Sequence, residues 1–323
     1  MTTVHHGPTP AAPSVAVTEP MPVPQRVVEN IVEAALAEDN PTGDLTGNVL
    51  LPADATAIAD VIAREPGIAS GLGVFATTMV LTDPALTVDL ALADGQPFAA
   101  GDVLATVSGS ARSVLAGERV ALNLLQRLSG IATLTRAFVD AAAGTAARIA
   151  DTRKTTPGLR ALERYAVRCG GGHNHRGSLS EAVMAKDNHL ALLGTGAELT
   201  AALRAARARL GHTVHFEVEI DGLDQLDAVL NAGVDTIMLD NFTPADLIEG
   251  VRRINGAAYV EASGNVTLET VAELAATGVD VISSGALTHS VRSLDLGLDV
   301  RIGGAAATTA ATDAVAGQGT VRT

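Results

Sequence analysis

The stretch from Val214 to Gly285 reads VHFEVEIDGLDQLDAVLNAGVDTIMLDNFTPADLIEGVRRINGAAYVEASGNVTLETVAELAATGVDVISSG, and its rhythm predicts the fold. Apolar runs recur about every 21 to 24 residues, at 214–220, 236–241, 258–263 and 279–285. Helix-like stretches at 223–233, 244–254 and 268–278 lie between them. Strands that alternate with helices in this way predict parallel βα units, and a barrel is their natural closure.

Two further apolar runs, at 147–152 and 182–187, extend this pattern toward the N-terminus. Before them the rhythm differs. Residues 25–38 place Val28, Ile31, Val32 and Leu36 on one face, which predicts an amphipathic helix. Strand-like runs follow at 55–63, 86–93 and 103–109, and a long helix is expected to begin near Ser113 as its N-cap. The chain is therefore predicted to be α/β, with a small α+β domain followed by a barrel.

Composition narrows the function. The chain has a net charge of −14, a pI near 4.9 and 2% aromatic residues, which disfavours binding to nucleic acid. The apolar runs are too short to span a membrane. One cysteine, Cys169, cannot form an internal disulfide, so we expect a cytoplasmic protein and a buried thiol. Residues 1–24 and 304–323 are predicted to be disordered tails.

Lysine is rare, and both lysines of the chain, Lys154 and Lys186, lie in one basic segment. Between Asp151 and Lys186 seven basic residues face three acidic ones, a net of +4, whereas the whole chain is −14. Such an island in an acidic protein indicates a pocket for small polyanions. For the arginines at 160, 164 and 168, spaced by four residues, a solvated helix face is the alternative interpretation.

Polar residues end each predicted barrel strand, and the carboxyl ends of parallel barrel strands form the active-site face. They are Asp151, Arg153, Lys154, Lys186, Glu219, Asp240, Ser263 and Ser284. Alternation along 216–220 places Glu217 and Glu219 on one side, where Lys154 and Lys186 are candidate partners. A purely structural ion-pair network is the alternative. The sequences ASGN (262–265) and SSGA (283–286) look like phosphate-binding turns, although Ser-Gly also forms ordinary turns.

Seven motifs closely resemble the quinolinate phosphoribosyltransferase family in order and spacing: DTRKTTPGLR, YAVRCGGGHNHR, AKDNH, FEVEID, LDNF, EASGN and SSGALTHS. The resemblance covers residues 25–303 and includes EDNPTGDLT and GERVALNLLQRLSGIAT. It implies a type II phosphoribosyltransferase fold, with an N-terminal α+β domain at 25–129, onto which 290–303 packs back, and an incomplete seven-stranded barrel at 130–289. Two positions depart from the family pattern: His173 is at a variable position, and Asn265 stands where many members have glycine.

The resemblance also implies the activity, which is phosphoribosyl transfer from phosphoribosyl pyrophosphate (PRPP) to quinolinate with decarboxylation, in NAD biosynthesis. Products are nicotinate mononucleotide, pyrophosphate and CO2, and Mg2+ accompanies PRPP. The positions that bind quinolinate in the family correspond here to Arg119, Arg153, His175 and Arg176. The resemblance also places two catalytic residues, Lys154 and Lys186, beside both substrates. Glu219 and Asp240 match the catalytic and magnesium-binding acids, and Ser263, Gly264, Ser284, Gly285 and His289 match the 5-phosphate site. The family is a homodimer, or a hexamer, in which Arg119 reaches the neighbouring subunit's site.

Three other functions are weighed against this one. A Schiff-base aldolase would use Lys154 or Lys186 at a strand end. A lipoyl-like carrier module is suggested by residues 93–110, but no lysine is near that hairpin to be modified. Nicotinate phosphoribosyltransferase has a related fold and a substrate with one carboxylate. Three arginines around a histidine favour the dicarboxylate.

Overall fold

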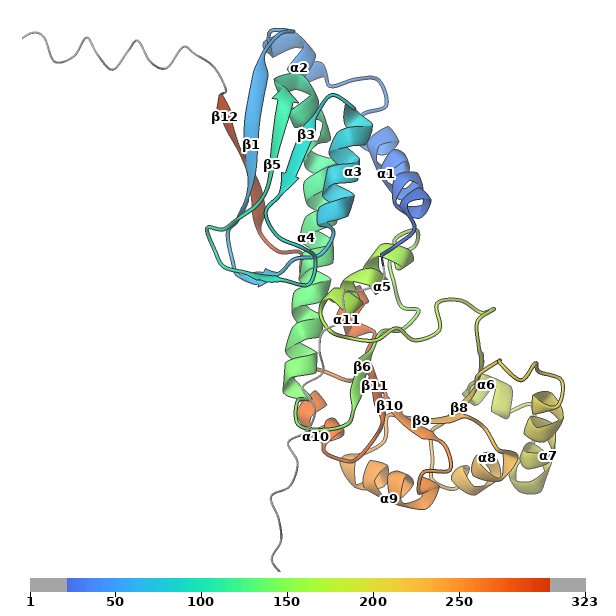
Figure 1. The fold of residues 1–323 in the computed structure, drawn as a ribbon. Coiled ribbons are helices and arrows are strands. Elements are labelled where there is room, and N and C mark those ends of the chain that lie inside the picture. Colours follow the sequence, from blue (N-terminus) through green and yellow to red (C-terminus); the bar gives the residue numbers. More distant parts are fainter. Residues whose placement is uncertain (1–21, 303–323) are drawn as a thin grey trace, which may run out of the picture.

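The computed structural model describes residues 22–302, which form two parts joined by one long helix (Figure 1). The tails expected at 1–24 and 304–323 lie outside the described residues, except for 22–24. α1 (Gln25–Asp39) buries Val28 and Val32 and packs Ile31 and Leu36 beside them, so the predicted amphipathic helix is confirmed. A short helix, α2 (Leu45–Leu50), follows.

The first part is built on an antiparallel sheet in the order β12-β1-β5-β3. Its strands are β1 (Thr56–Ala63), β3 (Thr87–Leu90), β5 (Val103–Ser110) and β12 (Leu296–Ile302), and the three predicted runs are thereby confirmed as strands. A separate pair joins β2 (Gly67–Ile68) to β4 (Pro97–Phe98). α3 (Leu72–Thr82) and α4 (Ala111–Ala141) cover the sheet, and Phe75, Met79 and Leu125 lie in the core.

The last described strand returns to this first part. β12 pairs along β1 from Ala57↔Ile302 to Ala63↔Leu296. Its register spans nearly all of β1, so the sheet of the first part includes a strand that follows the whole barrel in the sequence. The antiparallel sheet therefore depends on contacts between residues more than 200 positions apart.

α4 (Ala111–Ala141) is a continuous helix of 31 residues that runs from the first part to the barrel (Figure 1). It passes without a break through the domain boundary expected at 129/130. The prediction of Ser113 as its N-cap is wrong, because Ser110 Oγ caps the helix by accepting from the Ser113 N–H at 3.4 Å. Ser113 Oγ instead donates to Asp83 Oδ2 at 2.7 Å, a tertiary contact that the local sequence does not reveal.

The second part is a parallel sheet of six strands in the order β6-β11-β10-β9-β8-β7. They are β6 (Arg148–Ala150), β7 (Val183–Ala185), β8 (Phe216–Ile220), β9 (Thr236–Asp240), β10 (Tyr259–Ser263) and β11 (Val281–Ser283), and all six predicted strands are confirmed. β6 and β7 are the two edges of this sheet, so the barrel is open between them.

The seventh strand that the resemblance implied is reduced, within residues 22–302, to a single parallel bridge between His173 and Ala150. The His173 N–H donates to Ile149 O at 2.8 Å, and Asp151 N–H donates to His173 O at 3.1 Å. The ladder ends there because the next inward residue, His175, donates its N–H to the Asp151 carboxylate at 2.7 Å instead of to a strand carbonyl.

Helices follow each of the barrel strands along the chain. They are α5 (Arg160–Cys169), α6 (Asp187–Leu190), α7 (Gly196–Arg207), α8 (Leu226–Ala232), α9 (Pro244–Ile254), α10 (Val271–Ala275) and α11 (Ala286–His289). Along β8, Phe216, Val218 and Ile220 join the apolar core, and the alternate positions Glu217 and Glu219 face the lumen. This alternation decides which side chains reach the site.

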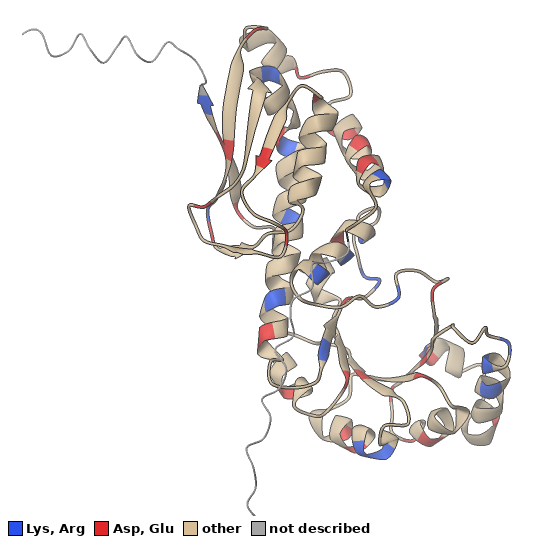
Figure 2. Cartoon of the chain, in the orientation of Figure 1, with Lys and Arg blue, Asp and Glu red and all other residues tan. Residues whose placement is uncertain are grey.

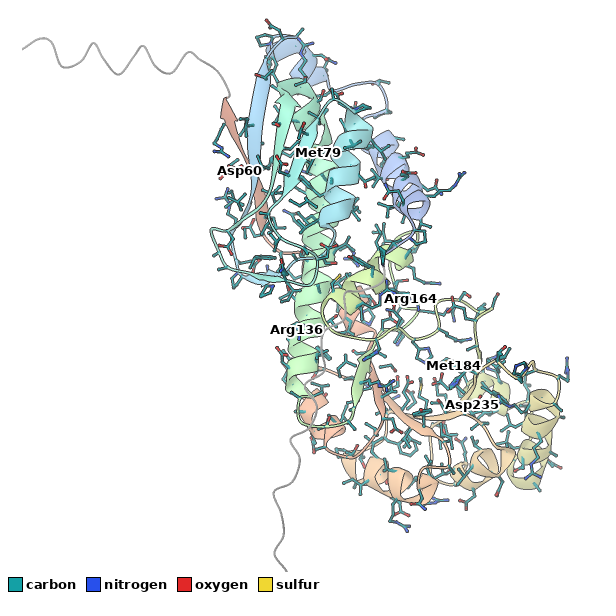
Figure 3. The ribbon with its side chains drawn as sticks, in the orientation of Figure 1. Asp60, Met79, Arg136, Arg164, Met184 and Asp235 are labelled. Atoms are coloured by element: carbon teal, nitrogen blue, oxygen red, sulfur yellow. The ribbon has the colours of Figure 1, made fainter. Side chains whose placement is uncertain are left out.

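The arginines of α5 do not form a solvated face. Arg160 Nη1 donates to Gly177 O at 2.9 Å, Arg164 Nη2 donates to His175 O at 2.6 Å, and Arg168 lies over the Tyr165 ring. All three arginines are half-buried, and Arg160 and Arg164 hold the loop that carries His175 and Arg176. Figure 3 labels Arg164 on α5 and Met184 on β7, which is one edge strand of the barrel sheet.

Candidate active site

The carboxyl ends of the barrel strands meet at one edge. Ser263 pairs with Asp240 across β10 and β9, Glu219 pairs with Met238 across β8 and β9, and Lys186 directly follows β7. Parallel register therefore brings these predicted site residues onto the same face. Figure 2 shows acidic residues on the barrel strands and basic residues on α5 and the adjoining loops.

Lys186 and Glu219 form an ion pair at this face, between Lys186 Nζ and Glu219 Oε2. Glu219 is largely buried, with 13% of its side chain exposed, whereas Lys186 retains 42%. The predicted pairing of a lysine with a lumen carboxylate is confirmed here. The carboxylate is thus held by its neighbour, and the ammonium still reaches solvent.

Lys154 lies beside the turn after β11. Thr288 Oγ1 donates to Lys154 O at 2.8 Å, which fixes the lysine backbone against α11. At Gly285, a Cβ would lie 2.8 Å from Lys154 Cδ and 2.9 Å from His289 Nε2. Glycine at this position leaves room for the Lys154 and His289 side chains to converge on one turn.

The turn after β10 has a special backbone. Gly264 has φ +90° and Asn265 has φ +49°, both in the left-handed region. Asn265 Nδ2 donates to Asn241 Oδ1 at 2.9 Å. Because asparagine tolerates this region better than other non-glycine residues, Asn265 can stand where glycine is common. Ser284, after β11, is buried and its Oγ donates to Val266 O at 3.2 Å, so it braces the second turn against the first.

His175 meets two carboxylates in the lumen, and this cluster departs from the expected pairing. Its Nε2 lies 3.1 Å from Glu217 Oε2 and 3.5 Å from Glu261 Oε2. Glu217 thus pairs with a histidine and not with a lysine. Sequence reasoning missed Glu261, although a carboxylate between Val260 and Ala262 in an apolar strand was a detectable signal.

The protonation of this cluster is set by opposing effects. Burial lowers the pKa of His175, but hydrogen bonds and charges from Glu217 and Glu261 raise it to about 10. At Nδ1, however, the ring accepts the Arg176 N–H at 2.7 Å, which opposes a second ring proton. The geometry therefore favours a neutral imidazole that donates from Nε2, with the extra proton on Glu217, because burial raises the pKa of that carboxyl.

The same geometry argues against a metal ion between His175, Glu217 and Glu261, whose ligand atoms lie within 4.8 Å of one another. A metal-binding histidine usually donates its second ring N–H to an acceptor. Here the second nitrogen faces a donor, so Nε2 must keep its proton and cannot bind metal. Glu219 and Asp240 fit magnesium better: Lys186 and Asn241 each occupy one carboxylate oxygen, and one oxygen remains on each acid.

A cavity of about 720 Å³ lies in the amino-terminal half of the lumen. The first residues of four strands, Arg148, Thr236, Tyr259 and Val281, line it. Of the predicted site residues, those on its lining within the described chain are His175 and Arg176. The cavity therefore opens at the amino-terminal ends of the strands, where it reaches His175 and Arg176. The other predicted site residues lie toward the carboxyl ends of the strands.

Two predicted arginines are more exposed. Arg153 follows β6 and is close enough to Arg176 that its positive charge adds to burial in lowering the Arg176 pKa. Arg119 lies on α4 eight residues before Arg127, about 12 Å along the helix axis. Its side chain is 58% exposed, and its ion pair is with the adjacent Glu118 at 3.8 Å. The structure does not bring Arg119 to the other site residues of its own chain.

The predicted role of Cys169 as a buried residue is confirmed, and burial raises its pKa to about 12. Within residues 22–302 no helix combines the length and apolarity needed to cross a membrane.

Comparison with known proteins identifies the family. The model of the quinolinate phosphoribosyl transferase N-terminal domain matches residues 44–129, and that of the C-terminal domain matches residues 131–299. The chain belongs to the quinolinate phosphoribosyltransferase family. Its fold is therefore that of a type II phosphoribosyltransferase, as the motifs predicted.

Relatives within the quinolinate phosphoribosyltransferase family span nearly the whole described chain. A probable nicotinate-nucleotide pyrophosphorylase (carboxylating) of Bacillus subtilis is 44% identical over 266 residues, covering 82% of this chain and 90% of the relative. The Mycobacterium leprae enzyme of that name is 44% identical over 278 residues, covering 83% and 95%. The structure of the Francisella tularensis nicotinate-nucleotide pyrophosphorylase superposes with a TM-score of 0.81 at 36% identity, covering 88% and 99%.

Proposed function

We propose that this chain transfers the phosphoribosyl group of PRPP to quinolinate, with decarboxylation, to give nicotinate mononucleotide, pyrophosphate and CO2. The observation that carries the proposal is the arrangement of charge in the barrel lumen. Arg153 and Arg176 lie close together, and the charge of Glu217 also acts on Arg176. Two residues further along β8, Glu219 pairs with Lys186. This combination suits a dianionic acceptor beside a donor whose sugar becomes positive.

Arg176 and Arg153 would hold the two carboxylates. A guanidinium binds a carboxylate through two parallel N–H groups, which an ammonium cannot do. Arg176 Nη1 donates to Ala182 O at 3.1 Å, so one edge of its fork is fixed by the protein and the other can face a ligand. The His175 ring, held between Arg176 N–H and the two glutamates, supports the loop that carries this arginine.

Glu219 and Asp240 would act on the sugar. As pyrophosphate leaves, positive charge grows at the ribose anomeric carbon, and nearby carboxylates stabilise it. Magnesium, held by the free oxygens of these acids, would neutralise the pyrophosphate charge. Replacing Glu219 with glutamine should then lower kcat far more than it raises KM for PRPP, because the interaction is strongest in the transition state. If only KM changed, Glu219 would be a ground-state binding residue.

The 5-phosphate would lie at the two turns after β10 and β11. Gly264 and Gly285 allow a close approach of the backbone, Lys154 adds positive charge, and the His289 ring lies beside it. Ser263 stands at the end of β10, and Ser284 braces the turns. The exposed guanidinium of Arg119 supports a homodimer with shared sites, or a hexamer of such dimers, in which it would contact the partner's quinolinate. The cytoplasm is the proposed compartment.

The test is an assay of the purified protein with quinolinate, PRPP and Mg2+, following nicotinate mononucleotide by chromatography and CO2 release. Nicotinate replaces quinolinate in the matched control. Turnover of nicotinate with no turnover of quinolinate would overturn the proposal. Borohydride trapping with a carbonyl substrate would separately detect an aldolase, in which a lysine must be free to form a Schiff base; Lys186 is already ion-paired with Glu219.

A further inference from the structure

Arg127, in the middle of α4, joins three segments of the barrel. Its Nε donates to Glu163 Oε1 at 2.7 Å, and its Nη2 donates to Thr156 Oγ1 at 2.9 Å and to Thr288 O at 2.8 Å. These partners belong to α5, to the loop after β6 and to α11, respectively. A single guanidinium thus connects α4, the helix shared by both parts of the molecule, to the segments that follow β6 and β11 at the carboxyl face.

The carboxylate that anchors Arg127 is completely buried. Glu163 has 0% of its side chain exposed, and its second oxygen accepts the Thr156 N–H at 3.0 Å. A buried carboxylate requires a counterion and hydrogen bonds to all of its oxygens. Glu163 therefore fixes the guanidinium and the backbone of the β6 loop together, and neither can shift without leaving a buried group unpaired.

The segments after β6 and β11 both carry predicted substrate residues. Thr288, whose carbonyl binds Arg127, donates its own hydroxyl to Lys154 O at 2.8 Å. The side chains of Lys154 and His289 converge over Gly285, within 2.9 Å of where a Cβ would stand. The path from Glu163 through Arg127 and Thr288 therefore ends at the residues that define the turn after β11.

We propose that Arg127 and Glu163 are positioning residues that hold the Lys154 loop against the Gly285–His289 turn and so set the phosphate end of the PRPP pocket. This inference rests on the proposed function. Lysine cannot replace Arg127, because its single ammonium cannot reach Glu163, Thr156 and Thr288 in the fixed directions of the guanidinium fork. Arg127 lies on α4, which runs through the first part of the molecule and contacts both α5 and α11. The Arg127–Glu163 pair therefore also couples the first part to the donor pocket.

The test compares Arg127→Lys with the parent by calorimetric binding of PRPP with Mg2+ and, separately, of quinolinate. We expect PRPP Kd to rise by about 10-fold or more, because charge-assisted bonds near the donor turn are lost. Quinolinate Kd should change by less than about 2-fold, because Arg160 Nη2, which donates to Arg153 O at 3.3 Å, still holds the backbone of the quinolinate arginine. Arg252→Lys is the matched control, since its fork binds Glu249 on the exposed face of α9. It should leave both Kd values unchanged.

A second measurement separates positioning from general stability. In a Lys154→Ala background, Arg127→Lys should have little further effect on PRPP Kd, because Arg127 acts through the Lys154 loop. Thr288→Val, which removes the bond to Lys154 O, gives the same readout if Arg127→Lys does not fold. An undiminished effect in that background, or lower stability with unchanged PRPP Kd, would overturn the inference. Failure of the parent to bind PRPP would instead overturn the proposed function.

Discussion

Gly264→Ala should lower kcat/KM for PRPP by more than backbone strain alone explains. The residue has φ +90°, and a Cβ there would lie 2.7 Å from the Asn241 backbone nitrogen, which donates to Ser263 O at 2.9 Å. Asn241 Nδ2 also donates to Asp240 Oδ2 at 2.7 Å. The new methyl group must therefore displace the residue that orients Asp240.

The magnitude follows from two separate costs. Alanine in the left-handed region costs about 1–2 kcal/mol of stability. Loss of one charge-assisted interaction through Asp240 costs about 1.5–3 kcal/mol more, or roughly 10- to 150-fold in kcat/KM for PRPP. Gly101→Ala isolates the first cost, because Gly101 has φ +92° and no atom within 4 Å of its Cβ position.

The assay combines urea unfolding with steady-state kinetics at varied PRPP. Both variants should lose a similar amount of stability through backbone strain, but only Gly264→Ala should have a lower kcat/KM. Equal kcat/KM for the two variants, close to that of the parent, would show that the clash between the new methyl group and Asn241 does not disturb Asp240, and would refute this prediction.

Three further outcomes are expected. Arg176→Lys should weaken quinolinate binding by about 10- to 150-fold in calorimetry although charge is kept, since the fork is lost; unchanged Kd would remove it from the acceptor site. Mixing inactive Arg119→Ala with inactive Lys154→Ala under subunit exchange should restore up to about a quarter of the sites if Arg119 acts across a two-fold interface; exchange verified by mass spectrometry without recovery would exclude this. Hydrogen bonds from Arg292 and the Asp295 N–H lower the pKa of Glu65 to about 2. A carboxyl whose pKa is lowered in the folded state stabilises the fold at pH values above its unfolded-state pKa, and this stabilisation is lost as the pH falls toward the folded-state pKa. Glu65→Gln should therefore lower the free energy of unfolding at pH 6, by at most about 1 kcal/mol because the Arg292 side chain is exposed, and should lower it less at pH 3. An equal loss at both pH values would contradict this.

The sequence by itself determined the order of elements and the family. The even spacing of apolar runs over 214–285 predicted four of the barrel strands, and all four formed, because burial between a lumen and covering helices imposes that spacing. The strand-end residues Lys186, Glu219, Asp240 and Ser263 came to one face for the same reason, since parallel register aligns strand ends.

Tertiary structure decided the contacts that no local pattern encodes. Glu217 met His175 and Glu261 in place of a lysine because the loop after α5, tied down by Asp151, carries the histidine into the lumen. Arg127 looks like an ordinary polar residue on a long helix until Glu163 is seen buried against it. Such pairings depend on which side chains a fold encloses together, and burial removes the water that would otherwise satisfy them, so they follow from packing and not from spacing along the chain.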